Sequence, residues 1–332
     1  MTRVTSPSAL RLALAAAVLT GLAGLGACGG GGGSSGDSGG GGGTGPLAIT
    51  VDNGFAVARA GVTAATAGQL AATANAGLIG PSGAQFAINQ ARRARDLAVP
   101  SLASGRRYPA GVQTFPCSRS GTISFNLIDL NNDQQFDASG ESLTLTAVQC
   151  DEGTGLKIDG AFTLALTAYT DANNFALNLV FANFSAVDQT AATTFAVNGS
   201  LVVALSNGNE ISVHSDIFSA SSKAGGGATH SFSAQNYTAS VLDGGTQLTE
   251  SVAGTFSSSD YGGQSVTIST PVALVILTDD SYPSQGTMVI AGASGSAAKL
   301  EALNAAQVRV SVDANGDGNY EVSSTVNWPE ID

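Results

Sequence analysis

From about residue 120 onward, apolar and small polar residues alternate along the chain with a period of two. In "TISFNLIDL", Ile123, Phe125 and Leu127 fall on one face and small polar residues on the other. The segments "GAFTLALTAY", "NFALNLVFANF", "GSLVVALS" and "QVRVSVD" repeat the pattern. Such alternation is typical of β-strands with one buried face. The sequence therefore predicts a mainly β domain over residues 117–332.

The connections between these segments are short and rich in turn residues. Asn207-Gly208 is a strong hairpin signal, and Asp243-Gly244-Gly245 and 171–174 are similar turns. No helical crossover intervenes, so consecutive strands should be antiparallel neighbours. A meander of roughly eleven strands does not stay flat. We expect a large curled antiparallel sheet, a barrel or half-barrel, with a β-sandwich as the alternative.

Three of the segments share a pattern in which an apolar residue, a small or polar residue, glycine, a small residue and an apolar residue follow one another. The glycines are Gly160, Gly199 and Gly254. Because glycine inside a strand marks a bulge or a point of curvature, we expect the sheet to bend at these positions.

The region before the strands, residues 47–116, has a different pattern. Residues 55–99 are rich in alanine, are interrupted at Gly80-Pro81 and end before Pro100. This predicts two short helices that pack on the sheet. An arginine cluster follows, which would lie in solvent, pair with acidic groups of the sheet or contact the phosphates of anionic lipids; it comprises Arg92, Arg93, Arg95, Arg106 and Arg107.

The N-terminus has the features of a secretory signal. Arg3 and Arg11 precede an apolar run over 12–27, which is shorter than the roughly 20 residues of a membrane-spanning helix. The run ends in Leu25-Gly26-Ala27-Cys28, which resembles the lipobox of bacterial lipoproteins. The resemblance implies a signal peptide over 1–27 and lipid attached to Cys28. Because Gly29 follows in place of aspartate, it also implies the outer membrane.

Residues 28–46 join the lipobox to the rest of the chain and are nearly all Gly and Ser. Such a linker is a flexible coil with a root-mean-square span of about 23 Å. Since it has no side chains to pack, a chain that starts near Val51 should still fold. The strand pattern as a whole resembles a group of β-rich proteobacterial envelope lipoproteins without an assigned activity.

Charge and cysteine content narrow the class of protein. The net charge is −12, and residues 120–332 hold 22 acidic and four basic side chains. This part of the chain would repel nucleic acid, which we exclude as a partner.

Export places Cys117 and Cys150 in an oxidising compartment, where they should form a disulfide. Strands 121–130 and 141–149 should then pair as a hairpin with the disulfide at its base.

Two acidic stretches are candidate calcium sites because calcium binds six to eight oxygen ligands in such loops. In "DLNNDQQFDASGE" the candidate ligands are Asp129, Asn131, Asp133, Gln135, Asp137 and Glu141. In "DANGDGNYE" they are Asp313, Asn315, Asp317, Asn319 and Glu321. Both resemble the EF-hand and dockerin loops, although Gln134 replaces the usual glycine of the first. The alternative for both is an Asx-rich turn that binds its own backbone.

Catalytic motifs are few. His214 and His230 are the only histidines, and no nucleophile motif has a credible context. We therefore expect a lipid-anchored, non-enzymatic envelope protein with a structural or interaction role, on the periplasmic or outer surface of the outer membrane. Its partners would be the membrane, through the anchor, and an envelope protein. The alternatives are a carrier of a lipid or other apolar ligand and a hydrolase of envelope glycans with a carboxylate pair.

Overall fold

The computed structural model describes residues 45–59, 62, 111–131, 137–151, 153, 155–171, 173–190, 192–225 and 227–331. The expected signal peptide, Cys28 and nearly all of the linker lie outside this part of the chain. Most of the helical region expected over 55–99 lies outside it as well. The described part is helical at 54–59 and at 62 and does not support two helices.

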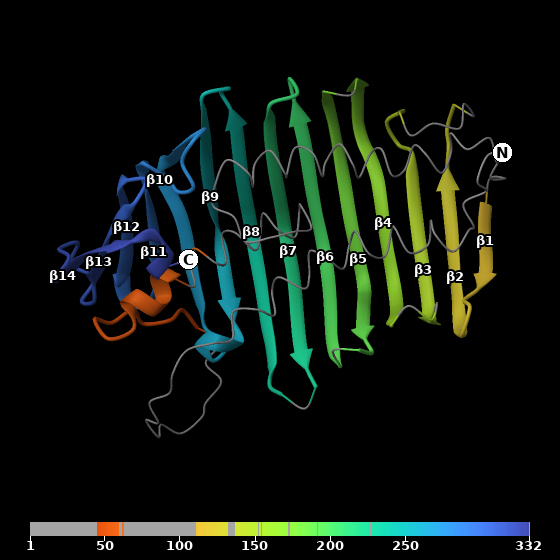
Figure 1. Ribbon diagram of the computed structural model, residues 1–332, viewed down its shortest axis with the longest axis horizontal. Helices are drawn as coiled ribbons and strands as arrows, with labels where there is room; N and C mark the ends of the chain where they lie inside the picture. The colour runs from red at the N-terminus through yellow and green to blue at the C-terminus, as the bar shows by residue number, and fades with distance from the viewer. Residues whose placement is uncertain are drawn as a thin grey trace.

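In the described part of the chain, fourteen strands form one antiparallel sheet in which each strand lies beside the next strand of the sequence (Figure 1). They are β1 (Gly111–Pro116), β2 (Ser120–Ile128), β3 (Ser142–Asp151), β4 (Leu156–Asp171), β5 (Asn174–Asp188), β6 (Thr193–Ser206), β7 (Glu210–Ala224), β8 (Thr229–Asp243), β9 (Gln247–Ser258), β10 (Ser265–Leu277), β11 (Gln285–Ala291), β12 (Ala297–Asn304), β13 (Gln307–Asp313) and β14 (Val322–Asn327). Short 3₁₀ turns follow β9, β11 and β14: η2 (Ser259–Tyr261), η3 (Ala293–Gly295) and η4 (Trp328–Glu330). The expected antiparallel meander is confirmed.

The sheet is broad and changes direction near its C-terminal end. Figure 1 shows β1–β9 side by side in one row, and β10–β14 turning out of that row. Strands β1 and β14 stand at opposite ends of the hydrogen-bonded order, so the described sheet is open. No helix in the described ranges is long and apolar enough to cross a membrane.

The period-two pattern corresponds to one buried and one polar face. Leu164 and Leu166 in β4 and Leu201, Val203 and Leu205 in β6 are almost completely buried. Burying each such side chain contributes about 1.5–3 kcal/mol. The other face carries hydroxyl pairs that join neighbouring strands; these are Thr144–Thr163 (3.0 Å), Ser233–Ser257 (2.7 Å) and Ser311–Ser323 (3.0 Å).

The glycine pattern marks β-bulges, as expected. Gly160 has φ +96° and Gly199 φ +113°, and the strand register shifts beside both. A Cβ at Gly160 would lie 2.2 Å from the carbonyl oxygen of Asn183, so no other residue fits there. Gly254, the third predicted position, also has a positive φ and a register shift beside it.

A polar side chain precedes two of these glycines and completes the bulge on the neighbouring strand. Gln149 and Asn183 are both left-handed, with φ +49°. The N–H of Gln149 donates to Asp159 Oδ1 (2.9 Å), and the N–H of Asn183 donates to Asn198 Oδ1 (3.1 Å). Each bulge thus keeps its backbone donor satisfied. The same hydrogen-bonded bulge occurs between β3 and β4 and between β5 and β6, so these two strand pairs repeat one structural unit.

The residues at the end of the linker are part of the fold. Pro46 forms a β-bridge with Ser265, and the N–H of Leu47 donates to the carbonyl oxygen of Ser265 (2.8 Å). Ile49 is completely buried, and its N–H donates to Ser296 Oγ (3.0 Å). Residues 46–49 therefore pack against β10 and the turn after β11. The expectation that a chain starting near Val51 still folds stays a prediction, although such a chain would lose these contacts.

The disulfide between Cys117 and Cys150 is confirmed, with a Cα–Cα distance of 5.5 Å. The expected hairpin is present as well, since Ile123 pairs with Ala147 and Ile128 with Ser142 in the β2–β3 ladder. The first acidic stretch is the loop of this hairpin.

Candidate metal centre

The loop between β2 and β3 is organised around one buried acid. Glu141 is fully buried, and its carboxylate accepts the N–H groups of Leu130 (3.3 Å), Asp137 (2.8 Å) and Ala138 (3.0 Å). Asn131 Nδ2 donates to Asp137 Oδ1 (3.2 Å). Both oxygens of Glu141 are therefore used by the loop's own backbone.

In its described part, residues 129–131 and 137–141, the first loop contains the backbone-to-carboxylate hydrogen bonds of a self-bonded turn. Its candidate ligands Asp133 and Gln135 lie outside the described residues. Among the described residues, Asp129, Asp137 and Glu141 do not form a group of converging carboxylates. A calcium site in this loop stays a prediction.

The loop between β13 and β14 is the converging group. Asp313, Asp317 and Glu321 each offer a carboxylate oxygen, and these oxygens lie within 4.8 Å of one another. Val312 pairs with Val322 at the base of the loop, which places Asp313 and Glu321 opposite each other. Asp313 is buried at 3% exposure, whereas Asp317 and Glu321 are exposed. The hairpin itself therefore brings together residues eight positions apart in the sequence.

Backbone amides orient these acids. Asp313 accepts the N–H groups of Gly316 (2.7 Å) and Gly318 (2.9 Å), one on each carboxylate oxygen. Glu321 Oε2 accepts the N–H of Ala314 (2.9 Å), and Asp317 Oδ1 accepts that of Asn319 (2.7 Å). A carboxylate has about four lone-pair sites, so each acid retains the capacity to bind a cation.

Asn315 is a further candidate ligand in the second loop. Its Oδ1 accepts the N–H of Asp317 (2.8 Å), and its Nδ2 donates to Asp317 Oδ2 (3.3 Å). Of the candidate ligands, the three acids thus converge, while Asn315 bonds to one of them and Asn319 contributes its backbone.

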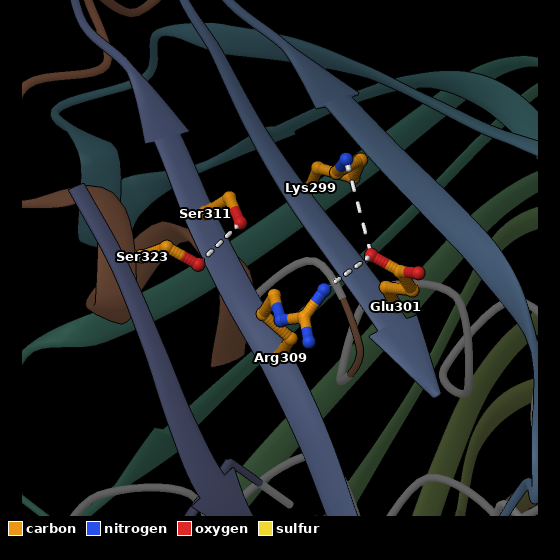
Figure 2. A network of polar contacts seen from close by, with 5 residues as sticks. All are labelled: Lys299, Glu301, Arg309, Ser311 and Ser323. Carbon is orange, nitrogen blue, oxygen red and sulfur yellow. Dashed lines mark hydrogen bonds and ion pairs between the residues drawn. The ribbon is translucent and has the colours of Figure 1, made fainter. Parts of the chain in front are cut away.

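Two cations on the strands beside this loop, Lys299 and Arg309, pair with an acid of the sheet. Figure 2 shows Lys299 on β12 and Arg309 on β13 directed at Glu301, with nitrogen–oxygen distances of 4.0 and 3.4 Å. Lys299 also lies 4.7 Å from the ring centroid of Tyr320. Burial and the charge of Asp313 raise the pKa of Tyr320. The negative charge of the loop therefore shifts the pKa of one of its own side chains.

The two histidines lie on the exposed surface of the sheet. His214 Nε2 lies 3.0 Å from Asp216 Oδ1, and both side chains are well exposed on β7, two residues apart. An exposed pair of this kind contributes little to stability. His230 lies on β8 and is exposed.

Glu250 is a buried acid that the sequence pattern did not single out. Glu250 in β9 is 6% exposed, and burial raises its pKa to about 7. Tyr237 is fully buried, and burial raises the pKa of its hydroxyl; the charge of Glu250 raises this pKa further. The alternation of the strand could have identified this acid, because Glu250 has the same phase as Leu248 and Val252 on the buried face.

Comparisons with family models, with curated proteins and with solved structures found no match to this chain.

Proposed function

We propose that this chain is a cell-envelope lipoprotein, anchored to the outer membrane by lipid on Cys28, with a structural or interaction role. The observation that carries the proposal is the sequence Leu25-Gly26-Ala27-Cys28 followed by a Gly/Ser-rich linker. The linker ends at Pro46, where the chain joins the sheet beside Ser265. A signal, an acylation site, a tether and a folded domain thus follow one another in the order that a lipoprotein requires.

The β domain supports an interaction role through its shape. Strands β4–β9 are 12–16 residues long and lie in one row, so they present a broad polar face. A tethered domain with such a face can contact an envelope partner without leaving the membrane surface.

Calcium is the cofactor that we propose for the second acidic loop. Asp313, Asp317 and Glu321 supply carboxylate oxygens, Asn315 an amide oxygen and Asn319 a backbone carbonyl, and oxygen ligands of this kind suit calcium. What supports the proposal is the convergence of three carboxylate oxygens within 4.8 Å at one hairpin tip. The ion would hold together acids that otherwise repel one another.

The anchor is tested by changing Cys28 to alanine in the producing cell. The wild type should partition into the detergent phase, and Cys28→Ala should stay in the aqueous phase or remain unprocessed. The matched control is Cys117→Ala, which removes the disulfide and leaves the lipobox intact, and it should still partition as the wild type does. Equal partition of wild type and Cys28→Ala would contradict the proposal.

A further inference from the structure

A groove opens on the sheet toward one end of β5–β9, and neither the lipobox nor the acidic loops explain it. Its volume is about 480 Å³. The described residues that line it are all uncharged, and half of them are serines. Ser259 and Gly263, which follow the end of β9, and Asn183 of β5 are among the residues that line it.

The strand register arranges the groove's polar side chains in rows. Asn198 pairs with Ser219, Ser219 with Ser233, and Ser233 with Ser257. Because directly paired residues of neighbouring strands share a face, these four side chains form one row across β6–β9. The hydrogen bond between Ser233 Oγ and Ser257 Oγ (2.7 Å) confirms that both lie on the same face.

A second row lies two residues further along the same strands. Ser221 pairs with Ser231, and the N–H of Ser231 donates to Ser259 Oγ (2.9 Å). Positions two apart in a strand share a face, so both rows line the groove. Val197 and Ala220 lie between the two rows in the sequence, are buried, and also line the groove.

The lining limits the chemistry of a ligand. Among the described residues of the lining there is no carboxylate to bind a cation and no Lys, Arg or His to bind an anion. Hydroxyl and amide groups both donate and accept hydrogen bonds, so they suit a neutral ligand that carries many hydroxyls. Neighbouring strands place these groups about 4.8 Å apart, close to the length of one sugar ring.

We propose that this groove binds a neutral oligosaccharide whose chain runs across β6–β9, one sugar per strand. The hydroxyls of Ser219 and Ser233, with the amide of Asn198, would bond to successive sugars. This proposal does not depend on the lipid anchor or on calcium. A protein without a lipidated cysteine would still bind the oligosaccharide, so the two proposals fail separately.

The test is calorimetric titration of the full-length protein in detergent with the tetramer of β-1,4-linked N-acetylglucosamine. The variant Ser219→Val/Ser233→Val removes two hydroxyls at positions where valine suits a strand. The matched control is Ser240→Val/Ser251→Val, a cross-strand pair on β8 and β9 outside the groove lining. Because two hydrogen bonds are lost, the groove variant should bind about tenfold more weakly, and the control should bind as the wild type does.

Three results would overturn the proposal. The first is no binding of the tetramer by the wild type at millimolar concentration. The second is equal affinity of the groove variant and the control. The third is a concentration-dependent dimer that the groove variant abolishes while the tetramer leaves it unchanged, because the groove would then be a contact between two copies. Cooperative melting curves of both variants would establish that they are folded. The variant Ser221→Val would repeat the test in the second row.

Discussion

At the scale of single residues, Glu250 makes stability depend on pH. Its strand partners are Val241 and Leu274, both apolar, and the fully buried Tyr237 is the other titratable group close to it. Burial raises its pKa from 4.5 to about 7. The folded state therefore holds this proton more tightly than the unfolded state does. The contribution of Glu250 to stability should therefore be greatest below pH 4.5 and decrease by about 3 kcal/mol as the pH rises through 7.

Glu250→Gln tests this effect. The variant keeps the shape of the side chain and cannot ionise, so it should be more stable than the wild type at pH 8 and nearly equal at pH 4.5. The measurement is the melting temperature across this range. The matched control is Glu210→Gln at the exposed start of β7, which should follow the wild type. A wild type and a Glu250→Gln variant with parallel pH profiles would show that the buried carboxylate is not the cause.

Glu250 also shows what the sequence could and could not reveal among single residues. Alternation correctly assigned the buried phase to Leu164 and Leu201, because burial of one face dictates that period. The glycines Gly160, Gly199 and Gly254 were recognised as bulges from their flanking residues. Gly121 and Gly286, which also have positive φ and no room for a Cβ, were missed because their neighbours do not follow the same pattern.

At the scale of elements, the β13–β14 hairpin is the loop whose stability should depend on calcium. Calcium should raise the melting temperature of the wild type relative to chelator, because it neutralises three converging acids. Asp317→Asn should remove much of this rise, since it takes away one charge and leaves the exposed loop otherwise intact. Asp137→Asn in the β2–β3 loop is the control and should keep the rise. Identical melting curves in calcium and in chelator would contradict the calcium site and would show that the loop is an Asx-rich turn.

The two acidic loops illustrate why the sequence alone could not rank them. Both have acids and amides at alternate positions, and both lie at the tip of a hairpin. The described ligands of the two loops differ in how they are arranged in space. Glu141 turns inward onto three backbone amides, whereas Asp313 and Glu321 face each other across a paired base. Strand register decides this, and register depends on the packing of the whole sheet.

At the scale of the whole molecule, the tether enters the domain at its C-terminal strands. Leu47 bonds on one side to Ser265, and its carbonyl oxygen accepts the N–H of Ala293 (2.8 Å) on the other. A chain starting at Gly45 should melt like the full domain, whereas one starting at Val51 loses Leu47 and the buried Ile49. The shorter chain should melt at a lower temperature, because burying Ile49 alone contributes about 1.5–3 kcal/mol. Equal melting temperatures would show that residues 45–50 contribute no stability.

The anchor itself is tested most directly by mass spectrometry of the N-terminal peptide of the mature protein, purified from the membranes of its own host. The account predicts that the mature chain begins at Cys28 and that this residue carries a diacylglyceryl group. A mature protein that begins at another residue, or one in which Cys28 is unmodified, would contradict it.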